Sequence, residues 1–189
     1  MPDDTRIRHV ADTDWEAIVA LEAAAYEPLG LSEERTVLES RVRASPDTCF
    51  VLFFEERLAG YLLALPYPMF AYPDLTRTEE TVFRSDNLHL HDLVVAEDLR
   101  GRGLGRSLLH RLAASAGASG YERISLVAVG GSDVFWAANG FVARPEAVRA
   151  GSYGTDSVYM SRPVRAVRAG QPEPTSARSR GSSSQHEEG

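Results

Sequence analysis

The sequence predicts an α/β fold in which a mixed central β-sheet is flanked by helices. Residues 88–112 combine an alternating apolar strand, a glycine-rich turn and a helix with a leucine stripe. Residues 123–129 are apolar almost throughout, as in a strand that is buried on both faces. Residues 49–55 and 58–65 are apolar runs on either side of a short turn, which predicts an antiparallel hairpin.

The other elements alternate along residues 1–163, which we assign to one domain. Ser32 is the expected cap of a helix whose acidic first turn suits the helix dipole. Residues 164–189 contain almost no apolar side chains and are expected to form a disordered tail. The further strands are expected at 5–10, 141–143 and 157–160, and the further helices at 15–25, 33–43 and 133–139.

Composition excludes several classes of protein. The net charge of −7 argues against nucleic-acid binding through a general positive field. No apolar run approaches the ~20 residues of a membrane-spanning helix. The single cysteine, Cys49, excludes an internal disulfide framework and a cysteine-based zinc site. We therefore expect a cytoplasmic protein, either a monomer or a homodimer, that binds neither nucleic acid nor membrane.

The stretch from Arg100 to Ser107 has the chemistry of an anion-binding loop. Three glycines at alternate positions let the backbone approach a ligand closely. The free amides of the following helix and three arginines add positive charge, which suits a pyrophosphate. The glycine spacing does not fit the G-x-G-x-x-G motif of a dinucleotide fold, and the Gly-Lys-Ser/Thr of a P-loop is absent.

Arg100-Gly101-Arg102-Gly103-Leu104-Gly105 resembles the acyl-CoA signature R/Q-x-x-G-x-G/A of the GCN5-related N-acetyltransferase (GNAT) family. His91 to Val95 is similar to the fourth strand of that family, and Phe135 to Phe141 is similar to its second motif, Y-x-x-x-G-F. The resemblance spans residues 5–162. It implies a GNAT fold, in which a bulge splays the fourth and fifth strands to admit acetyl-CoA.

The same resemblance implies the cofactor contacts. Backbone groups of the fourth strand would pair with the acyl-pantetheine, and the N–H of Val94 would stabilise the oxyanion. Trp136 would pack against the cofactor. The implied cofactor-binding residues are Leu93, Val94, Val95, Arg100, Gly101, Arg102, Gly103, Leu104, Gly105, Arg106, Ser107 and Trp136.

Two histidines are the candidates for the general base. His89 and His91 alternate with other residues, so they project from one face of the same strand. An imidazole can accept an ammonium proton near neutral pH, directly or through water. The alternative is that one or both are structural. A metal site is not expected, because no third ligand is evident.

The general acid is less clearly marked. Trp136 stands where many family members have a tyrosine, and an indole N–H is not a usable acid. Tyr153, in a loop before the last strand, is the preferred substitute, and Tyr159 is a second candidate. Alternatively, the leaving thiolate takes a proton from solvent.

These residues predict an N-acetyltransferase that transfers acetyl from acetyl-CoA to a primary amine by direct attack in a ternary complex. The alternative is a catalytically silent acyl-CoA-binding regulatory module. The acceptor would be a small-molecule amine or a peptide amine. Residues 66–87, which are aromatic, proline-rich and acidic, are expected near the mouth of the acceptor site.

Overall fold

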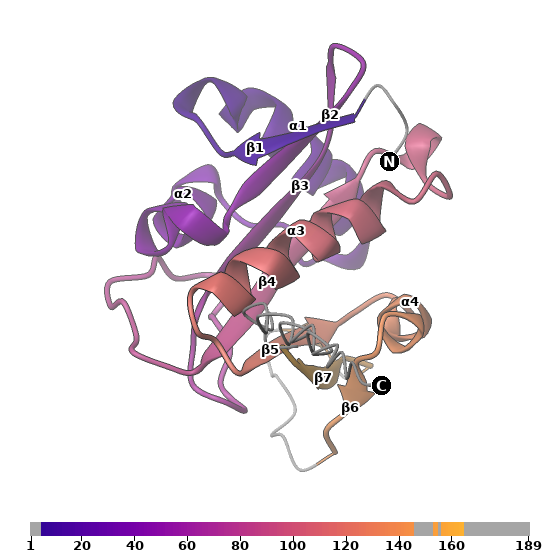
Figure 1. Ribbon diagram of the computed structural model, residues 1–189. Helices are drawn as coiled ribbons and strands as arrows, with labels where there is room; N and C mark the ends of the chain where they lie inside the picture. The colour runs from indigo at the N-terminus through magenta and orange to yellow at the C-terminus, as the bar shows by residue number, and fades with distance from the viewer. Residues whose placement is uncertain (1–4, 146–152, 155, 165–189) are drawn as a thin grey trace, which may run out of the picture.

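The computed structural model describes residues 5–145, 153, 154 and 156–164. The predicted tail, residues 164–189, lies outside these residues apart from Val164. A mixed seven-stranded sheet has the order β1-β2-β3-β4-β5-β7-β6, and β4 and β5 are its parallel pair (Figure 1). The strands are β1 Thr5–His9, β2 Phe50–Phe54, β3 Arg57–Pro66, β4 Asn87–Val95, β5 Arg123–Ala128, β6 Val142–Ala143 and β7 Val158–Pro163. The predicted fold class and the β2–β3 hairpin are confirmed.

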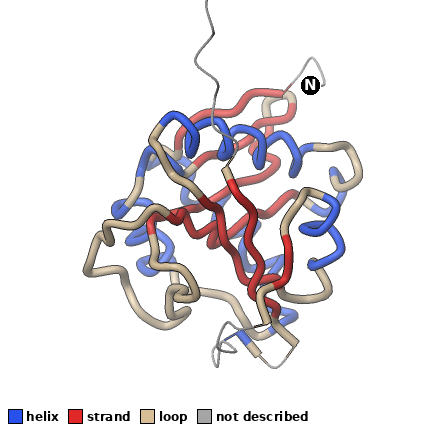
Figure 2. The backbone as a smooth tube through the Cα atoms, turned by 60° about the horizontal axis from the view of Figure 1, so that its bottom comes forward, coloured by secondary structure: helices blue, strands red, loops and turns tan. Residues whose placement is uncertain are grey.

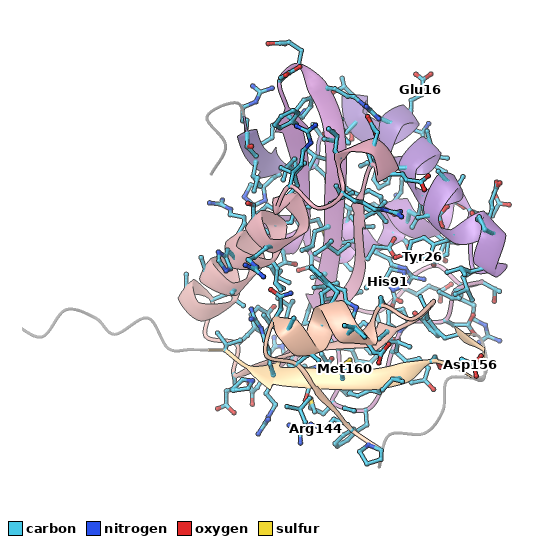
Figure 3. The ribbon with its side chains drawn as sticks, turned by 90° about the vertical axis from the view of Figure 1, so that its right-hand side faces the viewer. Glu16, Tyr26, His91, Arg144, Asp156 and Met160 are labelled. Atoms are coloured by element: carbon cyan, nitrogen blue, oxygen red, sulfur yellow. The ribbon has the colours of Figure 1, made fainter. Side chains whose placement is uncertain are left out.

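Helices cover both faces of this sheet. Figure 3 shows α1 and α3 on opposite sides of the strands, and Figure 2 shows the strands, in red, running through the middle of the molecule. Among the described residues, no helix has the length and apolar content needed to cross a membrane. The helices are α1 Trp15–Tyr26, α2 Arg35–Ala44, α3 Leu104–Ala118 and α4 Asp133–Ala138.

Each face of the sheet has its own core. The leucine stripe of α3 packs on one face, where Leu104, Leu108 and Leu112 are fully buried. Burial of each such side chain contributes roughly 1.5–3 kcal/mol. Trp15 and Ile18 of α1 pack with Leu38 of α2 on the other face. The two cores hold β4 between them, so its side chains have little freedom to move.

The start of α2 differs from the sequence prediction. The expected helix begins at Glu33 with Ser32 as its cap, but α2 begins at Arg35. The Ser32 hydroxyl instead donates a hydrogen bond to Glu22 at 2.7 Å, and the Glu33 amide donates to the same carboxylate at 2.8 Å. Glu33 therefore precedes the helix, and its side chain is buried instead of lying on the helix surface.

A β-bulge interrupts the pairing of β3 with β4. Asp92 lies opposite Leu63 and Leu90 lies opposite Ala64, so His91 is the extra residue. A bulge bends its strand and increases the local twist. The parallel pairs of β4 with β5 run only from Asn87 to His89 on β4. Beyond that point the two strands separate, as a splayed pair requires.

Gly60 allows β3 and β4 to approach closely. A Cβ at this position would lie 2.7 Å from the carbonyl oxygen of Val94. We expect Gly60→Ala to lower the free energy of unfolding by about 1–3 kcal/mol, because backbone must shift to relieve the overlap. Denaturant unfolding measures this change.

Gly105→Ala is the matched control for that substitution. Its Cβ would first meet a methyl group of Leu93 at 3.4 Å, an ordinary contact. Alanine is also the better helix former, so the control should unfold at the same or slightly higher denaturant concentration. Equal destabilisation by both substitutions would contradict the role of Gly60.

Candidate active site

The separation of β4 and β5 opens a cavity of about 750 Å³. Leu93, Val94 and Val95 line one side of it, and Leu126, Val127 and Val129 line the other. Tyr26 and Leu29, at and beyond the end of α1, also border the cavity. An elongated, partly apolar ligand therefore has room to enter between the two strands.

A glycine-rich loop borders this cavity at the start of α3. Gly101 and Gly103 have φ angles of 79° and 82°, which favour glycine, and Gly103 immediately precedes the helix. The N–H groups of the first helical turn have no intrahelical acceptor and so can bind an anion. Arg100 and Arg106 line the cavity beside them. This is the layout that the sequence predicted for a pyrophosphate.

Ten of the twelve predicted cofactor-binding residues line the cavity. Two do not: the guanidinium of Arg102 lies 5.5 Å from the centre of the Phe54 ring, and the Ser107 hydroxyl donates to the Gly103 carbonyl at 3.4 Å. The Trp136 indole donates to Ser132 at 3.2 Å. The ten residues are Leu93, Val94, Val95, Arg100, Gly101, Gly103, Leu104, Gly105, Arg106 and Trp136.

The β4 register indicates which backbone groups face the opened side. The Ala96 amide donates to the Ala59 carbonyl of β3 at 2.8 Å. Because hydrogen bonding alternates along an antiparallel strand, Val94 also directs its backbone groups toward β3. Leu93 and Val95 direct theirs away, and the Val95 carbonyl accepts from Arg100 Nε at 3.3 Å. Alternation thus favours Leu93 and Val95 over Val94 as donors to a ligand in the cavity.

His91, the bulged residue, lines the same cavity and contacts two ionisable side chains. Its Nε2 is hydrogen-bonded to the Glu33 carboxyl group, and its Nδ1 lies 3.4 Å from the Tyr153 hydroxyl. That hydroxyl donates to the Pro73 carbonyl at 3.1 Å. The structure therefore brings together two of the three predicted catalytic residues, His91 and Tyr153, and adds Glu33.

Burial controls the protonation of the cluster formed by His91, Glu33 and Tyr153. It lowers the pKa of His91 to about 3, and the nearby Arg41 guanidinium acts in the same direction. Burial raises the pKa of Glu33 to about 7, although Arg41 opposes that rise. The pKa of the Tyr153 hydroxyl is raised well above 10 by burial and by Glu33. Near neutral pH, His91 is therefore neutral and Tyr153 keeps its proton.

His89 lies elsewhere. Its Nδ1 is 3.1 Å from the Ser125 hydroxyl, and its ring stacks on Tyr159 with centroids 6.3 Å apart. The imidazole is almost completely buried and lines neither described cavity. His89 belongs to the paired part of β4, whereas His91 lies at the bulge. The structure therefore does not bring His89 to the cavity where sequence analysis expected it.

A second, water-sized cavity of about 20 Å³ also borders His91. Asp92 lines it and accepts a hydrogen bond from the Tyr61 hydroxyl at 3.0 Å. Burial raises the pKa of Asp92 to about 6. Tyr26 and His91, labelled near each other in Figure 3, line both cavities. They mark the place where the two spaces meet.

A buried arginine connects this cluster to the long loop between β3 and β4. Arg41 is hydrogen-bonded to Glu33, to Glu79 at 2.7 Å and to the Asp74 carbonyl at 2.9 Å. Asp74 and Glu79 of this loop are thus tied to the side chain that bonds Glu33, and the position of residues 66–87 at the mouth of an acceptor site stays a prediction. In Figure 2 the loops are drawn in tan.

Sequence reasoning missed Glu33, Arg41 and Asp92. Asp92 carried a usable signal, since a carboxylate in the apolar strand Leu88–Val95 needs a buried partner. No local pattern marks Glu33 or Arg41. Ligand atoms of Glu33, His91 and Asp92 lie within 4.8 Å of one another, a spacing that could hold a cation. Arg41 already pairs with Glu33, and the expectation of no metal remains a prediction.

A sequence profile of the acetyltransferase (GNAT) family matches residues 15–141, more than half of the chain. The chain belongs to this family. No curated protein matches the sequence significantly. The splayed strands and the Arg/Gly loop both lie within the matched residues.

Solved GNAT structures share the fold at low sequence identity. Ard1 from Thermoplasma volcanium matches with a TM-score of 0.66 and 16% identity over 85% of this chain and 98% of that chain. The loading GNATL domain of CurA from Lyngbya majuscula matches with a TM-score of 0.69, also at 16% identity and with the same coverage. The GphF GNAT-like decarboxylase in complex with isobutyryl-CoA has a TM-score of 0.62 and 23% identity over 85% and 100%. These likenesses establish the fold alone.

Proposed function

We propose that this GNAT protein transfers an acetyl group from acetyl-CoA to a primary amine by direct attack in a ternary complex. One observation carries the proposal. A single cavity is bordered by the Arg/Gly loop and by His91, which is bonded to Glu33 and near Tyr153. An anion site and a proton acceptor thus share one apolar space, as acyl transfer from a pyrophosphate-bearing thioester requires.

The loop would hold the pyrophosphate of acetyl-CoA. First-turn amides of α3 supply hydrogen bonds, and Arg100 and Arg106 supply charge. The acyl-pantetheine arm would lie between β4 and β5. Backbone N–H groups on the open side of β4, at Leu93 or Val95, would donate to the oxyanion that forms when the thioester carbonyl is attacked.

His91 would act as the general base. A primary amine arrives mostly as ammonium and must lose a proton before it attacks. The neutral imidazole accepts that proton transiently, and its hydrogen bond to the Glu33 carboxyl group fixes the ring. Glu33 is then a positioning residue, because it acts through His91. Burial excludes bulk water from this exchange.

Tyr153 would return a proton to the leaving thiolate. It keeps its proton at neutral pH because its pKa is well above 10, and its hydroxyl lies 3.4 Å from His91 Nδ1. The alternative is that the thiolate takes its proton from solvent.

A catalytically silent acyl-CoA-binding module is the second candidate. It is favoured by Trp136, whose indole bonds to Ser132 at the family's tyrosine position, and by the small space beside His91. The two functions differ in one measurement. Acetyl-CoA is incubated with a panel of primary amines while free CoA thiol and acetylated product are followed. Tight acetyl-CoA binding without amine-dependent CoA release would favour the silent module.

If Arg100 binds the pyrophosphate, Arg100→Ala should weaken the binding of acetyl-CoA. A charged hydrogen bond is worth about 1.5–3 kcal/mol, so the dissociation constant for acetyl-CoA should rise about 10- to 100-fold. Arg111→Ala is the control, because Arg111 lies farther along α3 with its guanidinium over the Phe50 ring. Isothermal titration calorimetry measures both variants, and equal affinities would contradict the role of Arg100.

A further inference from the structure

The water-sized cavity beside His91 has an unusual balance of charge. Its polar lining consists of Tyr26, Glu33, His91, Asp92 and Tyr153. Two of these are carboxyl groups, and the described lining includes no arginine. The chain has no lysine at all. The space next to the proposed base is therefore suited to a cation and lacks a partner for an anion.

The spacing of the acceptors suits one ammonium group. Ligand atoms of Glu33, His91 and Asp92 all lie within 4.8 Å of one another. Two acceptors that each bond to the same tetrahedral ammonium nitrogen at about 2.9 Å stand about 4.7 Å apart. A primary ammonium has three N–H donors, so it can bond to the Glu33 and Asp92 carboxylates together. His91, which is hydrogen-bonded to Glu33, is the residue that would take its proton.

Arg41 is not available to bind a substrate carboxylate here. Its guanidinium is fully buried and engaged by Glu33, Glu79 and the Asp74 carbonyl. Arg41 lines neither described cavity. A carboxylate on the carbon next to the amine would thus face Glu33 and Asp92 without a compensating cation, and like charges in a buried site repel strongly.

The walls of the small cavity limit the substituents that the carbon next to the amine can carry. Leu31, Leu75, Val127 and Val129 surround a space of about 20 Å³. A volume of ~15 Å³ already admits one water molecule, which is close in size to an ammonium group. A branch on the neighbouring carbon would have to displace one of these side chains. Packed side chains resist such displacement at a cost of about 1–3 kcal/mol.

We propose that the acceptor is a primary amine carried by a CH2 carbon, with no carboxylate and no branch on that carbon. This inference rests on the proposed acetyltransferase function and narrows its substrate class. Phenethylamine and agmatine fit the description, whereas α-amino acids do not. The ammonium enters the small cavity between Asp92 and Glu33 and meets His91 there. The rest of the acceptor extends outward, past Leu31 and Leu75.

Matched pairs of acceptors test the proposal. Phenethylamine is compared with phenylalanine, agmatine with arginine, and butylamine with sec-butylamine, by acetyl-CoA-dependent CoA release at pH 8. At that pH Glu33 and Asp92, with pKa values of about 7 and 6, are mostly ionised. We expect kcat/KM to be about a hundredfold higher for the amine than for its amino acid. The loss for sec-butylamine should be about tenfold or more.

Variants separate the charge effect from the size effect. Asp92→Asn should narrow the ratio between amine and amino acid by about tenfold and leave the ratio between butylamine and sec-butylamine unchanged. Glu34→Gln removes an exposed neighbouring carboxylate and should change neither ratio. Amino acids that react as fast as their amines would overturn this inference and leave the proposed function intact. Tight acetyl-CoA binding without CoA release for any acceptor would overturn both.

Discussion

Replacing His91 with alanine is expected to lower kcat for amine acetylation about 100- to 1,000-fold, the usual contribution of a general base. The dissociation constant for acetyl-CoA should stay within about threefold of the wild-type value, because the proposed charge contacts to the cofactor come from the Arg/Gly loop and not from His91. Glu33 keeps its bond to Arg41 in this variant, so the carboxylate is not left unpaired. Steady-state kinetics and calorimetry on the same preparation measure the two quantities.

The other histidines provide the comparison for that experiment. His110 is exposed on α3, and His110→Ala should leave kcat unchanged. His89 lines neither cavity, so His89→Ala should change the stability more than kcat. A large loss of kcat in His89→Ala together with near-normal turnover in His91→Ala would show that His89, and not His91, is the base.

Replacing Arg41 with methionine is expected to lower the free energy of unfolding by about 3–5 kcal/mol, because it leaves buried carboxyl groups without their cation. Arg41 contacts Glu33 and Glu79, whose side chains are 2% and 8% exposed. It also donates to the Asp74 carbonyl, so the substitution would loosen the long loop beside His91. Chemical denaturation measures the loss of stability.

The stability lost in Arg41→Met should depend on pH. Burial already raises the pKa of Glu33 and Glu79, and Arg41 opposes this rise, so its removal raises both pKa values further. A carboxyl group with a raised pKa stabilises the fold below its unfolded pKa, and this stability is lost as pH rises through the folded pKa. The part of the deficit due to Glu33, whose wild-type pKa is about 7, should therefore grow as pH rises above 7.

Arg43→Met is the control for this experiment. Arg43 lies on the same helix with a 66% exposed side chain, 3.7 Å from Glu39. Exposed ion pairs of this kind contribute about 0–1 kcal/mol. The role assigned to Arg41 would be contradicted if Arg41→Met lost no more unfolding free energy than Arg43→Met. It would also be contradicted if the loss in Arg41→Met became smaller as pH rises.

The cofactor half of the site could be predicted from sequence because it is local. Strand, Arg100–Ser107 and helix follow one another in the chain, and glycine conformation and helix-end amides act over a few residues. Ten of the twelve predicted residues accordingly line the cavity. The two exceptions, Arg102 and Ser107, show the limit of the local pattern, since it does not say which side of the loop faces the ligand.

The histidine half could be predicted only in part. Alternation along β4 treats His89 and His91 as equivalent, since period two assigns both to one face. The bulge at His91 breaks this equivalence, because it lies where β4 parts from β5. A bulge results from pairing with β3, so the residues of β4 alone do not reveal it.

The sequence by itself determined the family, the mixed sheet and the glycine-rich loop before α3, because each depends on neighbouring residues and on regular periodicity. Only the tertiary structure decided which histidine meets a cavity and which groups control its proton. Glu33 comes from the segment before α2, Tyr153 from the segment before β7 and Arg41 from α2. Long-range packing brings them to His91, and burial there shifts their pKa values.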